Sequence, residues 1–375
     1  MPRAPVIEVT KSDVAALAVE QAAEVLRHGG LVVIPTETVY GVAVSAFSEA
    51  GLARLVEAKQ RASKKPFTAH LPSADAVHQF VPALPALGKK LVLKAWPGPL
   101  TLVVPVENGV ATQVAEHMPA HFRRMLFYQD TIGLRCPDHP VTGALLSQVG
   151  QPVVASSANL GGAPPATDAE TAVEALGDQV DLVLDCGPAR YAKPSTVVQL
   201  GDEGYEVLRE GVFDSRMIRN MLRTTILFLC SGNTCRSPMA QGIARRLLSE
   251  RLGVAPPDLA SRGYHVISAG THAMGGTSAS PEAVHAAANL GAQIDQHQSQ
   301  PLTIELLRQS DHIYAMSRGH LETVGMLLPS ALSRAELLDP RGNIEDPVGS
   351  GQAVYYQVAE RIEQVIQHRL SEVIS

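Results

Sequence analysis

The chain has 375 residues, of which 45% are hydrophobic and 18% are charged, and its formal net charge is −6. Since a domain averages about 150 residues, this length predicts two or three domains. The negative charge excludes binding to nucleic acid through bulk positive charge, and no apolar run approaches the ~20 residues of a membrane span. With no apolar signal core and only four cysteines, the sequence predicts a cytoplasmic protein without a membrane partner or a disulfide framework.

Short strands and helices alternate through the first half of the chain. A helical pattern over residues 11–28 precedes a strand over 31–34, the loop 35–41 and a helix over 48–59. This loop is too polar and too glycine-bounded to belong to a core. Further strands are expected at 67–70, 100–104, 131–135, 152–155, 182–184, 195–198 and 206–209, and helices at 140–149 and from a capping box at 167–170 that starts with Thr167. Because basic and polar residues gather at strand ends, where α/β sheets bind ligands, we expect an α/β domain with an anion site.

Six short strings stand near these strand ends. They are Pro35–Gly41 (PTETVYG), Lys59-x-Arg61, Trp96–Thr101 (WPGPLT), Ser157–Asn159 (SAN), Pro194–Val197 (PSTV) and Leu208–Gly211 (LREG). In this order, over about residues 14–212, they resemble the threonylcarbamoyl-AMP synthase (YrdC-like) family. That family combines L-threonine, bicarbonate and ATP into threonylcarbamoyl-AMP and pyrophosphate for the t6A modification of tRNA. The resemblance implies a twisted, open α/β sheet.

The resemblance also implies which residues bind the substrates. Those around threonine are Thr38, His70, Arg135, Ala155 and Ser195. Those in contact with ATP are Arg61, Lys65, Thr131, Ser157 and Arg209, with Lys59 and Asn159 assisting. ATP is expected as a substrate with Mg²⁺ on its phosphates, with no organic cofactor and no metal site of the protein's own. The expected partners are the tRNA-modification machinery that uses the adenylate, with tRNA itself as a candidate.

The chemistry of this reaction agrees with a cluster of cations. The threonine amine must meet bicarbonate to form a carbamate, and the carbamate oxygen must then approach the α-phosphate of ATP. Both reactants of the second step are negative, so fixed arginine and lysine side chains reduce their repulsion and stabilise the departing pyrophosphate. Three departures from the family pattern weaken single assignments: Lys65 replaces a small residue, Pro165 replaces a serine, and Glu210 follows Arg209.

Residues 213–223 have a helical pattern without a strong turn signal and are predicted to form a helical connector. The predicted domains are therefore a synthase-like domain over 1–212 and a second domain over 224–375.

The second domain opens on the segment Cys230–Pro238, between an apolar strand at 225–229 and a helix. Such a junction turns backbone N–H groups and a helix N-terminus toward an anion, and it favours a thiolate. Cys230 is the predicted nucleophile, and Arg236 can fork its donors onto two phosphoryl oxygens. Ser237 is the predicted helix N-cap. The other predicted members of the phosphate loop are Ser231, Gly232, Asn233, Thr234 and Cys235.

Cys-x5-Arg is typical of cysteine-dependent phosphatases, and the full string resembles the low-molecular-weight phosphatase family over about residues 225–370. This resemblance implies a Rossmann-like parallel sheet and a phosphocysteine intermediate. It also implies an acid on an Asp-Pro loop, for which Asp346 and Asp339 compete and the spacing favours Asp346. His297 and Ser268 resemble positions that hold the loop asparagine, Asn233.

The expected substrate of this domain is a phosphoprotein. No aromatic residue occurs in Gly270–Ser280 or directly after Asp346-Pro347, where phosphotyrosine enzymes of the family hold the ring. Thr234 resembles the protein-arginine phosphatase branch, so phosphoarginine ranks above phosphotyrosine. The rival hypothesis is that the N-terminal half is a non-catalytic RNA- or nucleotide-binding module and the chain is a protein-tyrosine phosphatase only.

Overall fold

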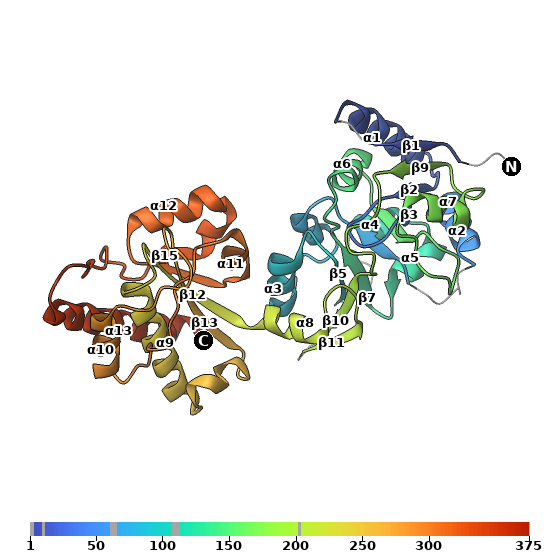
Figure 1. The fold of residues 1–375 in the computed structure, drawn as a ribbon. Coiled ribbons are helices and arrows are strands. Elements are labelled where there is room, and N and C mark those ends of the chain that lie inside the picture. The colour runs from blue at the N-terminus through green and yellow to red at the C-terminus, as the bar shows by residue number, and fades with distance from the viewer. Residues whose placement is uncertain (1–3, 10–11, 61–65, 107–112, 202–203, 375) are drawn as a thin grey trace. The chain divides into compact units, whose positions relative to one another are not determined.

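The computed structural model describes residues 4–9, 12–60, 66–106, 113–201 and 204–374. The chain divides into two compact units, residues 1–220 and 221–375. Figure 1 colours the chain by residue number, from blue at the N-terminus to red at the C-terminus. The division falls inside α8 (Ser215–Leu222), in the segment where the sequence predicts a helical connector. The domain limits themselves stay a prediction.

The first unit is built on one mixed sheet. Its strand order is β1-β9-β2-β3-β8-β4-β7-β5-β10-β11, and β6 pairs with β7 beside this path. The strands are β1 (Val6–Glu8), β2 (Val32–Ile34), β3 (Gly41–Ser45), β4 (Thr68–His70), β5 (Leu100–Pro105), β6 (Phe127–Tyr128), β7 (Thr131–Arg135), β8 (Val153–Ser157), β9 (Leu182–Asp185), β10 (Thr196–Leu200) and β11 (Tyr205–Arg209). The expected α/β class is confirmed, and all eight predicted strands are present as β2, β4, β5, β7, β8, β9, β10 and β11; β1, β3 and β6 were not predicted.

Helices cover this sheet. They are α1 (Ser12–Arg27), α2 (Glu49–Ala58), α3 (Ala86–Ala95), α4 (Gln113–His117), α5 (Ala120–Leu126), α6 (Pro140–Val149), α7 (Ala169–Leu176) and α8, with the short 3₁₀ helix η1 (Ala74–Gln79). The small residues Ala22 and Ala23 of α1 share one core with Leu145 and Leu146 of α6 and with strand residues such as Val32.

Two local expectations are wrong. The helix after the predicted capping box is capped by Asp168, not by Thr167, because the Asp168 carboxylate accepts a hydrogen bond from the Thr171 amide at 2.8 Å. The loop 35–41 is buried throughout, despite its polarity. Burial is possible because the polar groups of the loop find partners within the protein; the Thr36 hydroxyl, for example, donates to the Val39 carbonyl at 2.6 Å.

The second unit contains a fully parallel sheet in the order β13-β12-β14-β15. Its strands are β12 (Thr224–Cys230), β13 (Tyr264–Gly270), β14 (His312–Ala315) and β15 (Ala335–Leu337). Its helices are α9 (Arg236–Leu252), α10 (Pro281–Asn289), α11 (Ile304–Gln309), α12 (Arg318–Leu327) and α13 (Gln352–Val373), with the 3₁₀ helices η2 (Pro256–Ala260) and η3 (Pro329–Arg334). The expected Rossmann-like parallel sheet is confirmed.

Alternation along β12 explains why helices lie on both faces of this sheet. Ile226 and Phe228 belong to one core cluster with α9, α10 and α13. Leu227 and Leu229, which point to the opposite face, belong to another cluster with α11 and α12. Because both faces are covered, β12 is apolar without interruption, as is typical of a central parallel strand. Among the described helices, none has the length and apolar character to cross a membrane.

Candidate active sites

A cavity of about 520 Å³ lies against the sheet of the first unit. The strand register explains its main row of side chains. His70 on β4 pairs with Arg135 on β7, and Arg135 pairs with Thr101 on β5. Thr101 pairs in turn with Val197 on β10, which pairs with Arg209 on β11. All five residues line the cavity, so one row across five strands supplies two guanidinium groups and an imidazole.

The neighbouring row of the sheet carries no side chain larger than that of valine, and its residues also line the cavity. Thr68 on β4 pairs with Ala155 on β8 and with Gly133 on β7, and Gly133 pairs with Val103 on β5. A Cβ atom on Gly133 would stand 3.3 Å from the Thr68 hydroxyl oxygen and 3.3 Å from the Phe67 carbonyl oxygen. The absence of bulk in this row leaves space for a ligand.

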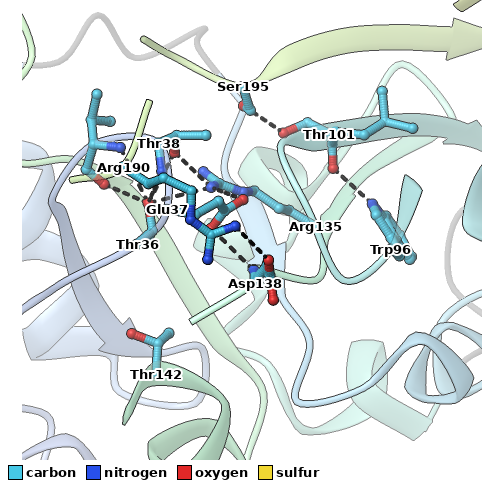
Figure 2. A network of polar contacts seen from close by, with 12 residues as sticks. Thr36, Glu37, Thr38, Trp96, Thr101, Arg135, Asp138, Thr142, Arg190 and Ser195 are labelled. Atoms are coloured by element: carbon cyan, nitrogen blue, oxygen red, sulfur yellow. Dashed lines mark hydrogen bonds and ion pairs between the residues drawn. The ribbon is translucent and has the colours of Figure 1, made fainter. Parts of the chain in front are cut away.

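The Arg135 guanidinium is held from the buried loop 35–41, as Figure 2 shows. Its Nη2 donates to the Thr38 hydroxyl at 2.6 Å, to Glu37 Oε1 at 3.0 Å and to the Thr36 hydroxyl at 3.3 Å. The Arg135 side chain is 7% exposed and that of Glu37 is fully buried. Nε of Arg135 has no hydrogen-bond partner within the described ranges. The protein therefore fixes the guanidinium through Nη2, and Arg135 lines the cavity.

Ser195 and Arg209 line the cavity at the end of the row away from His70. Arg209 donates from Nη2 and Nε to the Ser195 carbonyl at 2.9 and 3.2 Å, and the Ser195 hydroxyl lies 2.9 Å from that of Thr101. Although Arg209 as a whole is exposed, partial burial of its guanidinium and the nearby charge of Arg135 lower its pKa. Two cations that disfavour each other in this way favour an anion between them.

Only some of the residues predicted to contact ATP line the cavity. Thr131, Ser157 and Asn159 line the cavity. Lys59 instead lies 5% exposed at the end of α2, where Nζ donates to the Ser157 carbonyl at 2.5 Å and to Asn159 Oδ1 at 3.0 Å. It therefore holds the loop that carries the cavity residues. Arg61 and Lys65 lie outside the described residues.

The phosphate loop of the second unit is organised by Asn233. Its backbone has φ of +55°, in the left-handed region, and its amide N–H donates to Cys230 Sγ at 3.2 Å. The Asn233 side-chain amide donates to the hydroxyls of Ser237 and Ser268, each at 2.9 Å, and His297 Nε2 lies 2.8 Å from the backbone carbonyl oxygen of Asn233. The contacts that the sequence assigned to Ser268 and His297 are therefore present.

The helix after this loop starts two residues earlier than expected. α9 begins at Arg236 with Cys235 in the N-cap position, so the prediction of Ser237 as N-cap is wrong. The Ser237 hydroxyl is turned inward instead, 2.9 Å from Cys230 Sγ. Cys235 Sγ lies 3.5 Å from both the Tyr355 and Ser280 hydroxyls. Within the part of the chain described here, none of the four cysteines forms a disulfide.

The structure distinguishes the two candidate acids by their surroundings. Asp346 makes an ion pair with Nη2 of Arg236 and keeps 46% of its side chain exposed. The Asp339 side chain is 1% exposed and pairs with Arg341 and Arg361. Burial opposes ionisation of Asp339, but hydrogen bonds from these arginines lower its pKa to about 2. Asp346, not Asp339, lies next to the phosphate loop.

Comparisons with known proteins match each of the two units to a protein family. Residues 24–211 match the family model described as "Telomere recombination", whose short name joins Sua5, YciO and YrdC. Residues 225–374 match the model described as "Low molecular weight phosphotyrosine protein phosphatase". The threonylcarbamoyl-AMP synthase of Chromohalobacter salexigens is 35% identical over 184 residues, 48% of this chain and 92% of that relative. The chain belongs to the Sua5/YciO/YrdC family.

Two solved structures align with parts of the chain. The P. abyssi Sua5 protein complexed with L-threonine aligns with a TM-score of 0.52 at 20% identity, covering 72% of this chain and 92% of that one. The YwlE arginine phosphatase from Geobacillus stearothermophilus aligns at 31% identity over 40% of this chain and 92% of that one, with a TM-score of 0.35. Both resemblances inferred from the sequence are confirmed: a Sua5/YrdC domain is fused to a low-molecular-weight phosphatase domain, and the chain is an enzyme with two activities.

Sequence reasoning missed partners that lie far away in the chain. In the Sua5/YrdC domain these are Glu37, which neutralises Arg135, and Thr101, which orients Ser195. In the phosphatase domain it missed His320, whose ring lies 3.0 Å from the Ser231 hydroxyl through Nε2. The signal available for Glu37 was a charged residue inside the string PTETVYG next to a buried strand. No comparable signal marked His320.

Proposed function

We propose that the Sua5/YrdC domain makes threonylcarbamoyl-AMP and pyrophosphate from L-threonine, bicarbonate and Mg²⁺–ATP. The observation that carries this proposal is the row of Arg135, Thr101 and Arg209 along a cavity with a floor of small residues. Arg135 is suited to the threonine carboxylate because it is fixed in place and remains charged. Ser195 and His70 border the same space, and Ala155 lies in its floor. Thr38 acts by holding Arg135.

The ATP phosphates belong on the Arg209 side of the cavity in this proposal. Thr131, Ser157 and Asn159 line the cavity together with Arg209. Lys59 holds the loop that carries Ser157 and Asn159. Arg61 and Lys65 are further ATP contacts that the family resemblance implies. These cations and Mg²⁺ reduce the repulsion between carbamate and α-phosphate and stabilise the departing pyrophosphate. The product then serves the tRNA-modification machinery in the cytoplasm, with tRNA as a candidate partner.

Pyrophosphate release tests the synthase activity against the rival of a binding module. The full chain with Cys230→Ser is incubated with ATP, threonine and bicarbonate, so that the phosphatase cannot consume products. We expect pyrophosphate release that requires all three substrates and falls about 100-fold in Arg135→Ala. ATP binding without any pyrophosphate release would support the nucleotide-binding rival instead.

For the second domain we propose hydrolysis of phosphoproteins through Cys230. The thiolate sulfur attacks phosphorus while the bond to the leaving group breaks, and Asp346 gives its proton to the leaving atom. Arg236 and the backbone amides of the phosphate loop hold the phosphoryl oxygens. Water then attacks the phosphocysteine while Asp346 takes its proton as base, which releases phosphate and regenerates the thiolate. The contact between Cys230 and the Asn233 amide supports this assignment.

We further propose that phosphoarginine is preferred over phosphotyrosine. The described residues around the loop offer exposed aliphatic side chains, Met274 at 83% and Val348 at 67%, where a ring would need aromatic partners. Turnover of matched phosphoarginine and phosphotyrosine peptides tests this preference. Asp346→Asn should slow hydrolysis about 100-fold. Faster turnover of phosphotyrosine would contradict the substrate assignment, and unchanged turnover in Asp346→Asn would contradict the acid.

A further inference from the structure

The carbamoylation half of the proposed reaction needs a group that accepts a proton. An α-ammonium group is mostly protonated at neutral pH, and a protonated nitrogen has no lone pair to attack carbon. Four titratable side chains occur among the described residues that line the cavity: Tyr40, His70, Arg135 and Arg209. The guanidinium groups of the two arginines have donors and no acceptor. The Tyr40 hydroxyl donates to the Gly187 carbonyl at 2.7 Å, and burial raises its pKa. His70 is the remaining acceptor.

The hydrogen bond of His70 determines which nitrogen is available. Nδ1 lies 3.2 Å from the carbonyl oxygen of Thr68, which can only accept, so Nδ1 carries the hydrogen in the neutral ring. Nε2 is then unprotonated, and it has no hydrogen-bond partner among the described residues. Since the ring lines the cavity and is 8% exposed, Nε2 is the basic atom offered to a ligand.

Strand register places this atom beside the proposed carboxylate site. His70 pairs with Arg135 on β7 and, on the other side, with the apolar Val153 on β8. A threonine whose carboxylate binds Arg135 carries its α-ammonium on the carbon next to that carboxylate, close to the strand neighbour of Arg135, which is His70. We propose that His70 Nε2 binds the threonine α-ammonium and takes its proton, so that the free amine can attack bicarbonate. This inference rests on the proposed function of the domain.

The ammonium transfers one proton to Nε2 and becomes a neutral amine. The nitrogen lone pair forms the N–C bond with bicarbonate, and the hydroxyl of bicarbonate leaves with the second proton of the nitrogen as water. The carbamate remains, and His70 later returns its proton to solvent.

Charges around His70 make this transfer depend on threonine. Burial and the positive charge of Arg135 lower the pKa of His70 to about 3, so the ring is neutral. Glu37 pairs with Arg135 from the side of loop 35–41, and Arg209 lies further along the row. A threonine carboxylate on Arg135 offsets its charge and raises the proton affinity of Nε2. The base is therefore strengthened by the substrate it deprotonates.

Two variants separate proton transfer from binding. His70→Gln places an amide oxygen near Nε2 that accepts a hydrogen bond but cannot take a proton, whereas His70→Asn keeps only a donor to the Thr68 carbonyl. His78→Gln, an exposed histidine on η1, is the matched control. At pH 7 we expect His70→Gln to form threonylcarbamoyl-AMP about 100-fold more slowly than the wild type, with a threonine KM changed by less than about threefold. His70→Asn should also raise the KM.

The pH profile and the reverse reaction decide the assignment. The rate of His70→Gln should rise about tenfold per pH unit from pH 7 toward 9, as free amine replaces ammonium, while the wild-type rate stays nearly flat. ATP synthesis from threonylcarbamoyl-AMP and pyrophosphate needs no amine deprotonation and should stay near the wild-type rate in His70→Gln. Equal losses in both directions, or parallel pH profiles, would show that His70 only binds threonine. If wild type is inactive in both directions, the proposed function itself fails.

Discussion

At the scale of single residues, both sites depend on buried charges that have specific partners. Arg135 is supported by Glu37, and Arg236 by Asp346 and by the Ile344 carbonyl at 3.2 Å. A buried charge without a partner is strongly destabilising, so these partners keep each guanidinium in position rather than adding net stability. Function and local stability are therefore linked at these residues.

Glu37→Gln tests this link in the Sua5/YrdC domain. The substitution leaves the buried Arg135 charge uncompensated, so we expect a loss of about 3 kcal/mol in the free energy of unfolding and weaker threonine binding. Urea denaturation and threonine titration measure the two effects. Glu24→Gln, which removes an exposed pair with Arg27, is the control and should cost less than about 1 kcal/mol. Similar costs for both variants would contradict the role of Glu37.

Asp339 gives a pH-dependent prediction. Its pKa is lowered from 3.8 to about 2 in the folded protein, so its ion pairs stabilise the fold above pH 4 and are lost as the pH falls toward 2. The midpoint of thermal unfolding of the wild type should drop across this window, and Asp339→Asn should be less stable at pH 7 with a weaker drop. Asp295→Asn, at an exposed position, is the control. An identical acid dependence in Asp339→Asn would refute the assignment.

At the scale of elements, strand register creates the synthase site. Five strands each contribute one residue to the row from His70 to Arg209. The neighbouring row leaves space for a ligand because Gly133 has no side chain. Helix termini play the corresponding role in the phosphatase domain, where α9 begins at Arg236 directly after the loop. In the two proposed sites, anions are bound by different means, by side-chain cations in one domain and by backbone amides in the other.

Gly133→Val tests the floor of the cavity. Its Cβ would already be in tight contact with Thr68 and Phe67, and the added methyl groups would displace a bound substrate. We expect threonylcarbamoyl-AMP formation to fall about 100-fold while phosphatase turnover is unchanged. Gly143→Ala on α6, where an added Cβ meets nothing within 4 Å, should leave both activities intact. Wild-type synthesis by Gly133→Val would place the substrates elsewhere.

At the scale of the whole molecule, much of the architecture could be predicted from the sequence. Periodic apolar patterns predicted most strands, and family strings predicted both domains. The burial of loop 35–41 could not be predicted, because Glu37 is neutralised by an arginine 98 positions away. The link between Ser231 and His320 spans 89 positions and has no local signal. The short strand β3 was missed since it directly follows the polar loop, whose residues suggested a surface turn.

Each proposed site is made from residues of one unit, so each activity should survive the loss of the other. The most direct measurement is synthesis of threonylcarbamoyl-AMP from ¹³C-bicarbonate by the full chain carrying Cys230→Ser, followed by mass spectrometry. We predict that the labelled adenylate forms at the wild-type rate while phosphatase turnover is abolished. Binding of ATP without any labelled product, in both the variant and the wild type, would contradict the account.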